Sequence, residues 1–313
     1  MVYNKSLHVT ETAMLDLNTE LNPRLLDTLR CPVCGAPMGV EGNGRSLACR
    51  GLVSHRNLKG KTHLFDGGAG GYVNLAPNHS GGGDSKEAVR ARSSFLRSGY
   101  YTPAAEAIAA LARELTPEDG LVLDAGCGEG YYSNRVAEEG FAVLGVDLSK
   151  FAADTAAKSA RRERMNRGQA SSTLYAVGSV FELPVSDGSF DTVVNIFAPC
   201  APAEYARVLK SGGHLIVAGA GERHLFGLKE LIYDDPYLND PRRDLPAEGD
   251  GLRLLEVKNV TFTVTVGDPD HREALFSMTP YYWRTSREGH SRLAAAETLT
   301  TEVSFDLHIY EKL

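Results

Sequence analysis

The stretch Val122-Leu-Asp-Ala-Gly-Cys-Gly-Glu-Gly130 constrains the fold more than any other part of the chain. An apolar run ends at Asp124, a glycine then occupies every second position, and a helix-like run begins at Tyr131. Glycine lets the backbone approach a ligand closely where any Cβ would clash. The order of strand, glycine turn and helix predicts the opening of a doubly wound α/β domain, which binds its ligand at the carboxyl ends of the strands.

A second acidic residue narrows the choice of ligand. Asp147 ends another predicted strand, 142–147, and lies seventeen residues after Gly130. A carboxylate at that place suits the two hydroxyls of an adenosine ribose. Dehydrogenases also use a glycine-rich turn, so a nicotinamide cofactor is the alternative. The full pattern, Asp-x-Gly-x-Gly-x-Gly with the later acid, resembles motifs I and II of the methyltransferases that use S-adenosylmethionine (SAM), and we expect SAM.

Composition excludes several classes of protein. The 313 residues are 42% hydrophobic and 23% charged, which is typical of a soluble globular protein. No apolar run approaches the ~20 residues of a membrane helix, and residues 1–22 lack a signal-peptide core, so we expect a cytoplasmic protein with no membrane association. Because the net charge is −7, nucleic-acid binding would require a local basic patch.

Three of the five cysteines lie within one short segment, which indicates a metal rather than disulfides in a reducing cytoplasm. The sequence Cys31-Pro-Val-Cys34-Gly is typical of a zinc knuckle, in which the turn directs both sulfurs at one ion. Zinc requires four ligands, and Cys49 is the obvious third. His55 and His63 are both candidates for the fourth, and spacing alone slightly favours His55.

This cysteine-containing segment is also locally basic. Between residues 24 and 66 there are seven Lys and Arg residues against three Asp and Glu residues. In an acidic protein this asymmetry indicates polyanion binding. The alternative is a solvated, metal-bound module that binds no further ligand.

Glycine-rich sequence at 67–71 and 79–84 predicts a linker and a module boundary. We therefore expect an N-terminal extension at 1–23, a zinc-binding RNA-recognition module with its linker at 24–83, and the SAM-dependent domain at 84–313. In the last of these, strands are predicted at 175–180, 191–197, 211–217, 252–266 and 300–310, and helices at 85–97, 104–115, 150–164, 203–209, 222–233 and 270–278.

The acceptor of the methyl group is expected beside the end of the predicted strand 191–197. The candidates that line its pocket are Asn195, Phe197 and Pro199. Guanine N1 would have to lose a proton before it attacks a methyl group, and no residue stands out as the group that takes it. Phe197 or Trp283 could stack on a base, although the aromatic run 281–283 is more typical of a core corner.

Taken together, these residues resemble one family, the 23S ribosomal RNA guanine-N1 methyltransferases of the RlmA type with their macrolide-resistance relatives. The resemblance extends from about Cys31 to the C-terminus. It rests on Cys31-Pro-x-Cys34, His63-x-Phe-Asp66, Gly71-Tyr-Val-Asn-Leu75, Gly126-Cys-Gly-Glu-Gly-Tyr-Tyr132, Asp147-x-Ser-Lys150, Ala198-Pro-Cys200, Arg223-His-Leu225, Leu228-Lys-x-Leu-Ile-Tyr233, Met278-Thr-Pro280 and Trp283-Arg284.

The resemblance implies a Rossmann-like class I SAM-dependent methyltransferase fold with a small N-terminal zinc-binding module. It implies transfer of a methyl group from SAM to N1 of a guanine in 23S rRNA, and it is compatible with a homodimer. The implied zinc ligands are Cys31, Cys34, Cys49 and His63, so His55 remains the rival. The implied SAM contacts are Tyr101, Glu129, Gly130 and His224, to which the general methyltransferase motifs add Asp124, Gly126, Gly128, Asp147 and Ser179.

Two other functions fit the same residues. One is a small-molecule SAM-dependent methyltransferase whose zinc module is purely structural. The other is a protein that binds SAM and RNA without catalysis. Binding that weakens with salt would favour an RNA substrate, because phosphate contacts release counterions.

Overall fold

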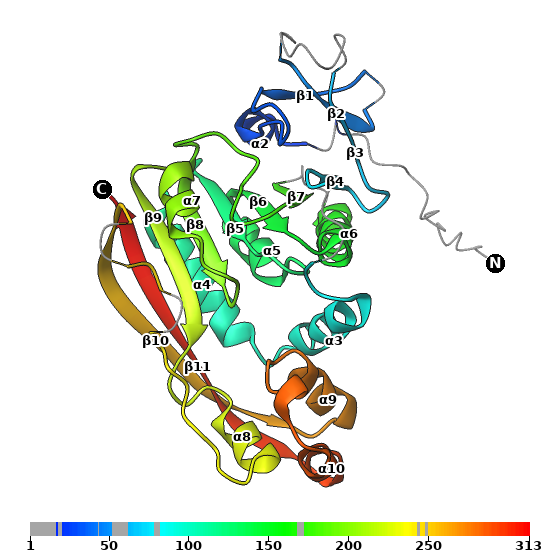
Figure 1. The fold of residues 1–313 in the computed structure, drawn as a ribbon, viewed down its shortest axis with the longest axis vertical. Coiled ribbons are helices and arrows are strands. Elements are labelled where there is room, and N and C mark those ends of the chain that lie inside the picture. The colour runs from blue at the N-terminus through cyan, green and yellow to red at the C-terminus, as the bar shows by residue number, and fades with distance from the viewer. Residues whose placement is uncertain are drawn as a thin grey trace, which may run out of the picture.

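The computed structural model describes Leu17 and residues 21–42, 44–51, 62–77, 82–167, 172–242, 245–247 and 250–313. The described residues form a large mixed sheet with helices on both faces, and a small three-stranded sheet at one end (Figure 1). None of the described helices is long and apolar enough to cross a lipid bilayer.

Eight strands make up the large sheet. In chain order they are β4 (Tyr72–Asn74), β5 (Leu121–Ala125), β6 (Ala142–Asp147), β7 (Thr173–Val177), β8 (Phe190–Ile196), β9 (Leu209–Ala220), β10 (Leu252–Val266) and β11 (Leu299–Lys312). Their order across the sheet is β10-β11-β9-β8-β5-β6-β7-β4. The strands from β9 to β4 are mutually parallel, whereas β11 is antiparallel to both β9 and β10. The strand order reverses beside β5, and such a reversal is where open α/β sheets bind ligands.

The helices cover both faces of this sheet. They are α2 (Pro23–Thr28), α3 (Lys86–Arg97), α4 (Thr102–Leu115), α5 (Tyr131–Glu138), α6 (Lys150–Arg167), α7 (Pro202–Val208), α8 (Phe226–Ile232), α9 (Pro269–Ser277) and α10 (Arg287–Ala295), with a 3₁₀ turn, η1 (Tyr282–Arg284). Alternate residues of β5 pack into different hydrophobic cores. Leu121 and Leu123 pack in the core that includes α7, and Val122 packs in the core that includes α4. This two-residue alternation is what a strand buried on both faces requires.

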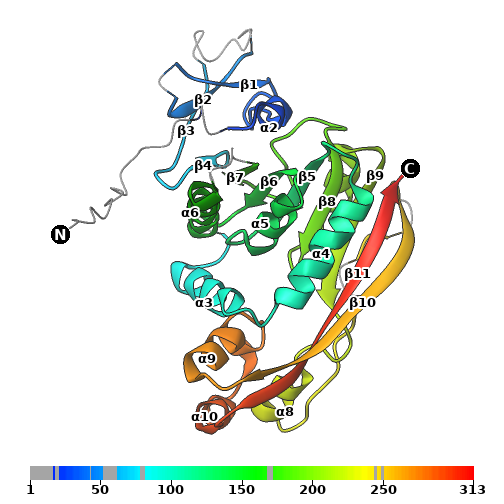
Figure 2. The ribbon, with the colours of Figure 1, turned by 180° about the vertical axis from the view of Figure 1, so that it is seen from behind.

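The directions of the strands define two ends of the large sheet. The strand β11 runs from the lobe of α8, α9 and α10 toward the C-terminus, and the parallel strands run the opposite way. Their carboxyl ends therefore face the α8–α10 lobe. The small sheet lies at the other end in both views (Figures 1 and 2).

The small antiparallel sheet contains β1 (Met38–Val40), β2 (Ser46–Cys49) and β3 (Leu64–Asp66) in that order. It is docked on the large domain through α2. Leu25 and Leu29 are fully buried in the same core cluster as strand residues of the large sheet, and the Arg30 amide donates to Pro184 O at 2.8 Å. After β3 the chain enters the large sheet itself as β4, so a strand within residues 24–83 pairs with β7.

Several predicted elements differ from those observed. The strands 142–147 and 252–266 have their predicted bounds. The helix predicted at 222–233 was wrong at its start, because Leu225 has a left-handed backbone (φ 57°) and α8 begins at Phe226. Neither β4 nor α10 was predicted. Leu17 of the N-terminal extension is buried in the core, and its amide donates to Gly44 O.

Candidate cofactor and metal sites

The glycine turn after β5 is built so that only glycine fits. Gly126 and Gly130 have φ of 86° and 79°, a region that side chains other than glycine rarely adopt. A Cβ on Gly126 would lie 2.3 Å from the Cβ of Ala198, and one on Gly130 would lie 2.7 Å from Tyr175 Oη. The amides of Gly126 and Cys127 both donate to Val146 O, which fixes the turn against the end of β6.

Three carboxyl groups surround this turn. Asp124 is buried at the end of β5 and accepts a hydrogen bond from Ser133 Oγ. Asp147 accepts from the amides of Gly128 at 3.0 Å and Ser149 at 2.7 Å. Burial raises the pKa of Asp124 and that of Glu129 to about 7, and it also raises the pKa of Asp147. The predicted acids are therefore brought together by the structure.

Sequence reasoning missed Arg92, which faces the same group from α3. Its guanidinium lies 3.7 Å from Glu129 Oε2 and also pairs with Asp84. The carbonyl of Asp84 accepts from Ser149 Oγ at 2.7 Å, beside the ribose-binding acid expected at Asp147. Residues 82–84, the end of the predicted linker, are thus packed against the cofactor site. No local pattern marks Arg92, because Glu129 lies 37 residues away and Asp84 lies outside the α3 helix.

A cluster of aromatic side chains surrounds Tyr101, which immediately precedes α4. Tyr101 is 2% exposed, and its ring lies 6.3 Å from the His224 ring and 5.6 Å from Phe305 between centroids. Tyr101 Oη is buried without a hydrogen-bond partner. His224 Nδ1 accepts from the Ser304 amide at 3.2 Å, which assigns the proton of the neutral ring to Nε2. Burial lowers the pKa of His224 to about 3. Phe305 was not predicted.

The predicted acceptor residues occupy different environments. Phe197 is 49% exposed, has φ of 51°, and contacts the His224 ring at 5.3 Å. Pro199 is exposed as well. Asn195 is buried, and its amide donates to Ala125 O, Pro199 O and Tyr205 Oη. In this arrangement Asn195 holds the loop after β8, whereas Phe197 and Pro199 face outward.

Two other predicted residues can also be located. Ser179 is partly buried after β7, and its Oγ accepts from the amide of Phe181. The aromatic residues after α9 lie in different environments, since Tyr281 is 7% exposed and Trp283 is 84% exposed. The predicted packing in a core corner therefore holds for Tyr281 but not for Trp283.

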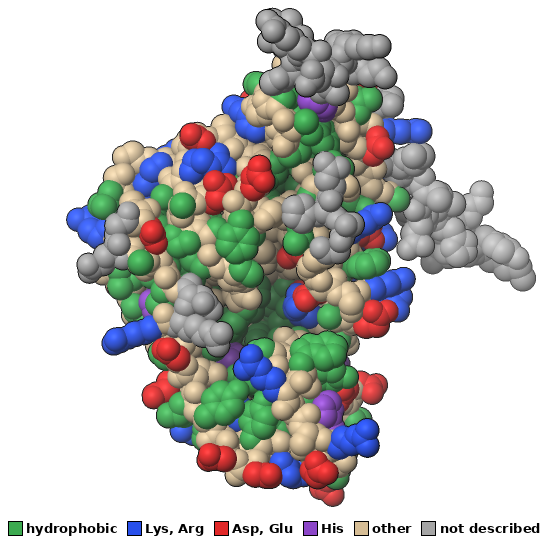
Figure 3. Space-filling view, in the orientation of Figure 1, with side chains coloured by type: hydrophobic (Ala, Val, Ile, Leu, Met, Phe, Trp, Pro, Cys, Tyr) green, Lys and Arg blue, Asp and Glu red, His purple; other side chains and the backbone are tan. Residues whose placement is uncertain are grey.

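The carboxyl ends of the parallel strands face a hollow in the surface. Figure 3 shows this hollow between the main body and the lobe below it, with hydrophobic side chains on its floor. Tyr101 Oη and Glu129 Oε2 are buried polar atoms without hydrogen-bond partners, and the turn leaves no room for a Cβ. Such features suit a polar cofactor that lies across the carboxyl ends of the strands.

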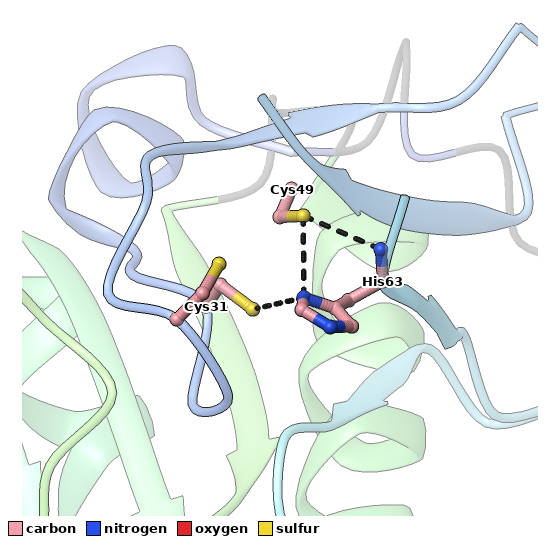
Figure 4. Close-up of side chains that lie close together, drawn as sticks. Cys31, Cys49 and His63 are labelled. Carbon is pink, nitrogen blue, oxygen red and sulfur yellow. Dashed lines mark hydrogen bonds between the residues drawn. The ribbon is translucent and has the colours of Figure 1, made fainter. Parts of the chain in front are cut away.

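The four predicted metal ligands meet in the small sheet. One ligand atom from each of Cys31, Cys34, Cys49 and His63 lies within 4.8 Å of all the others. His63 Nδ1 is 3.4 Å from Cys31 Sγ and 3.5 Å from Cys49 Sγ (Figure 4). A tetrahedral zinc ion separates sulfur and nitrogen ligands by about 3.5 Å. The donor set and the distances both fit zinc.

The local fold explains this convergence. Gly35 has φ of 70° and its amide donates to Cys31 O, which closes the knuckle turn. The Cys49 amide donates to His63 O at 3.0 Å, so the pairing of β2 with β3 continues to these two residues. His55 lies outside the described residues. Two of the basic residues counted in this segment, Arg24 and Arg30, use their guanidinium groups to bind backbone carbonyls.

Comparisons with known proteins agree on one kind of enzyme. Residues 123–217 match the family model described as "Methyltransferase domain". The 23S rRNA (guanine(748)-N(1))-methyltransferase of Streptomyces fradiae is 35% identical over 210 residues, which cover 65% of this chain and 67% of that protein.

Two further relatives are named as candidate 23S rRNA (guanine-N(1)-)-methyltransferases. The protein from Micromonospora griseorubida is 32% identical over 68% of this chain and 72% of its own length. YxjB of Bacillus subtilis is 28% identical, over 90% of this chain and 95% of its own length. These alignments extend well beyond the methyltransferase domain model.

Proposed function

The chain belongs to the 23S rRNA (guanine-N1-)-methyltransferase family and is a SAM-dependent methyltransferase, and from that premise we propose that it methylates N1 of a guanine in 23S rRNA. The observation that carries the proposal is the 35% identity to a relative named for that reaction. The proposal is supported by two exposed residues, Phe197 and Pro199, which lie at the same carboxyl end of the parallel strands as the glycine turn.

SAM supplies an electrophilic methyl group, so the protein needs to align the reactants and exclude water. In the proposed site Asp147 and the glycine turn hold the ribose. Tyr101 Oη and the Nε2–H of His224 are buried donors that suit the polar end of the cofactor. Ser179 would lie beside the adenine. Each of these groups is positioned by contacts that already exist.

The guanine would enter beside Phe197 and Pro199, the two exposed residues after β8. Exposed aromatic rings stack on unpaired bases, and Phe197 meets that requirement. Guanine N1 must release a proton. His224 Nε2 does not accept it in the observed tautomer, because Nδ1 is already an acceptor and Nε2 bears the ring proton.

Zinc is proposed to bind Cys31, Cys34, Cys49 and His63, and residues 24–83 are proposed to serve as an RNA-recognition module. The basic balance of residues 24–66 supports an RNA contact. The small sheet lies at the end of the large sheet that is opposite the α8–α10 lobe, and that lobe borders the hollow (Figures 1 and 3). We therefore expect the module to act on RNA affinity rather than on the chemical step.

The decisive experiment measures transfer of labelled methyl groups from SAM to 23S rRNA hairpin fragments. Primer extension would locate the product, since a methyl group on N1 blocks Watson–Crick pairing. The expected result is one arrest at a guanine, with a KM for RNA that rises with salt. The variant Cys31→Ser should raise KM for RNA more than it lowers kcat. Absence of labelling on every rRNA fragment, with salt-independent labelling of a small acceptor, would overturn the proposal.

A further inference from the structure

The lobe beside the hollow contains a buried lysine that the reaction described so far does not use. Lys229 lies in α8 and is fully buried. Its ammonium donates to Tyr237 O at 2.8 Å and to Asn239 Oδ1 at 2.7 Å. It also lies 4.2 Å from the centre of the Tyr237 ring and 5.0 Å from that of Tyr281. None of these partners is a carboxylate, so the charge is held by dipoles and ring faces alone.

Burying an ammonium group is costly unless its surroundings compensate it. Three separate segments cooperate here, since Tyr237 and Asn239 come from the chain after α8 and Tyr281 comes from the chain after α9. Tyr281 Oη donates to the same Asn239 oxygen at 3.0 Å. The oxygen of Asn239 therefore receives two hydrogen bonds, one of them from a charged donor, and such bonds are the stronger kind.

The side-chain nitrogen of Asn239 connects Lys229 to the turn that carries His224. Its Nδ2 donates to Gly221 O at 3.1 Å and to His224 O at 3.0 Å, and its backbone amide donates to Glu222 O at 2.8 Å. These acceptors belong to the turn that carries His224 into the cofactor site. A single asparagine thus joins the buried charge to the turn that places the His224 ring beside Tyr101 and Phe197.

We propose that Lys229 is a positioning residue for the cofactor site, which acts through Asn239 to hold the turn 221–224 and with it the His224 ring. The turn is also tied to β11, since the Gly221 amide donates to Ser304 O and the Ser304 amide donates to His224 Nδ1. Asn239 adds hydrogen bonds from the chain after α8, and the Lys229 ammonium fixes the oxygen of that asparagine. The rings of Tyr237 and Tyr281 cover the ammonium group.

The groups around Lys229 allow a test by pH. Burial lowers the pKa of Lys229 to about 8. The titratable side chains around it are the Tyr237 and Tyr281 phenols and His224, whose pKa is lowered by burial and also by the charge of Lys229. Tyr233 stacks on Tyr237 with 5.7 Å between the ring centroids. On the elements packed against α8, Glu302 of β11 pairs with Arg223, and Arg292 of α10 pairs with Asp234. We therefore expect SAM affinity to fall as the pH rises from 7 to 9 and the ammonium loses its proton.

Deprotonation of Lys229 is expected to have the opposite effect on folding stability. Because the pKa of Lys229 is lower in the folded protein than in the unfolded chain, the unfolded chain binds more protons above pH 8, and this group raises stability as the pH rises. A loss of SAM affinity without a loss of thermal stability would therefore come from positioning. A purely structural role would move both quantities together.

The experiment measures SAM binding to the full chain by calorimetry, without RNA, for wild type, Lys229→Met, Asn239→Ala and the double variant. Each single variant is expected to weaken binding by about tenfold, the effect of losing one or two charge-assisted hydrogen bonds. The double variant should be no weaker than either single variant, because both residues act through one contact. Lys229→Arg should retain binding and remove its fall between pH 7 and 9.

The variant Lys258→Met is the matched control, because Lys258 pairs with Glu114 on the surface of β10. It should bind SAM as wild type does. Additive losses in the double variant, or wild-type affinity in Asn239→Ala, would overturn the proposal even if Lys229→Met failed to fold. The inference rests on the SAM site of the proposed function and not on its acceptor. Failure of rRNA methylation by wild type would be a separate outcome, because SAM binding is measured without RNA.

Discussion

The two candidate ligand regions lie at opposite ends of the parallel strands and are built by different means. At the cofactor end, strands β5 and β6 place the glycine turn, buried Asp124 and partly buried Asp147 within one hydrogen-bonded unit. At the metal end, the ligands come from the knuckle at 31–34, from the end of β2 and from the start of β3. In the cofactor region, hydrogen bonds and packing between protein residues hold the glycine turn in place without a ligand. At the metal end, the proposed zinc ion would hold the four side chains together.

The largest expected effect tests that dependence on metal. His63→Ala should abolish stoichiometric zinc binding, as measured by metal analysis, and should lower the thermal midpoint by more than any other substitution considered below. Loss of a structural zinc site removes several kcal/mol of folding free energy. His55→Ala is the matched control and should retain one zinc per chain. Zinc retained by His63→Ala and lost by His55→Ala would reverse the assignment.

The second prediction tests whether the cofactor turn is limited by space. Gly126→Ala should weaken SAM binding by about a hundredfold, because its Cβ would lie 2.3 Å from Ala198 Cβ and push the acceptor loop away. Gly140→Ala is the matched control. Gly140 also has a positive φ, of 101°, but no heavy atom lies within 4 Å of the added Cβ.

Both glycine variants should lose about 1–2 kcal/mol of stability through backbone strain, measured by urea denaturation. Only Gly126→Ala should lose SAM affinity. Equal affinity losses in the two variants would show that backbone strain, and not crowding, limits the turn.

The third prediction concerns the pH dependence of stability at the cofactor end. Burial raises the pKa of Asp124 to about 7, so the folded protein holds a proton there that the unfolded chain has released above pH 4. This group therefore lowers stability as the pH rises from 4 to 7, by up to about 4 kcal/mol. Asp124→Asn should remove that part of the slope in urea denaturation.

The exposed Asp187→Asn serves as the control for this slope. Glu129 titrates in the same range, so the quantity to compare is the difference between variant and wild type. If that difference stays constant from pH 4 to pH 7, the carboxyl group of Asp124 does not titrate as described.

The smallest effect is expected at the contact between the two regions. Arg24 is exposed and donates to Asp119 O. Water competes for such a bond, so Arg24→Met should change stability by no more than about 0.5 kcal/mol and leave both ligand affinities unchanged. The docking is expected to depend on buried Leu25 and Leu29 instead. A loss above 2 kcal/mol on calorimetric unfolding would show that the polar contact dominates.

The contrast between the two regions also explains what the sequence could predict. The glycine turn and Asp147 were recognisable because the relevant residues lie within one strand-turn-helix unit and its neighbour. The knuckle predicted the cysteines that the structure brings together, and the resemblance to the family favoured His63 over His55. The pairing of β2 with β3 places His63 beside Cys49, and spacing does not encode that pairing.

Residues whose partners are distant in sequence were not predictable. Arg92 acquires its role only when α3 packs beside the turn, and Asn239 only when three segments meet around Lys229. Asn195 was predicted at the acceptor pocket from its place at the end of a strand. Its hydrogen bonds to Ala125, Pro199 and Tyr205 could not be read from that position.

The strand β4 connects the candidate metal region to the candidate cofactor region. It follows the last metal ligand, His63, within the same stretch of chain and pairs with β7. The Leu75 amide donates to Val177 O, and the next residue, Gly178, donates to Asp147 O. A short path of backbone bonds therefore runs from the proposed metal site to Asp147, the proposed ribose-binding acid. If filling one site stiffens this path, linkage makes the effect mutual, so zinc would tighten SAM by the same factor by which SAM tightens zinc. Titrating each ligand with and without the other measures that factor, and a value of one would mean that the shared strand transmits nothing.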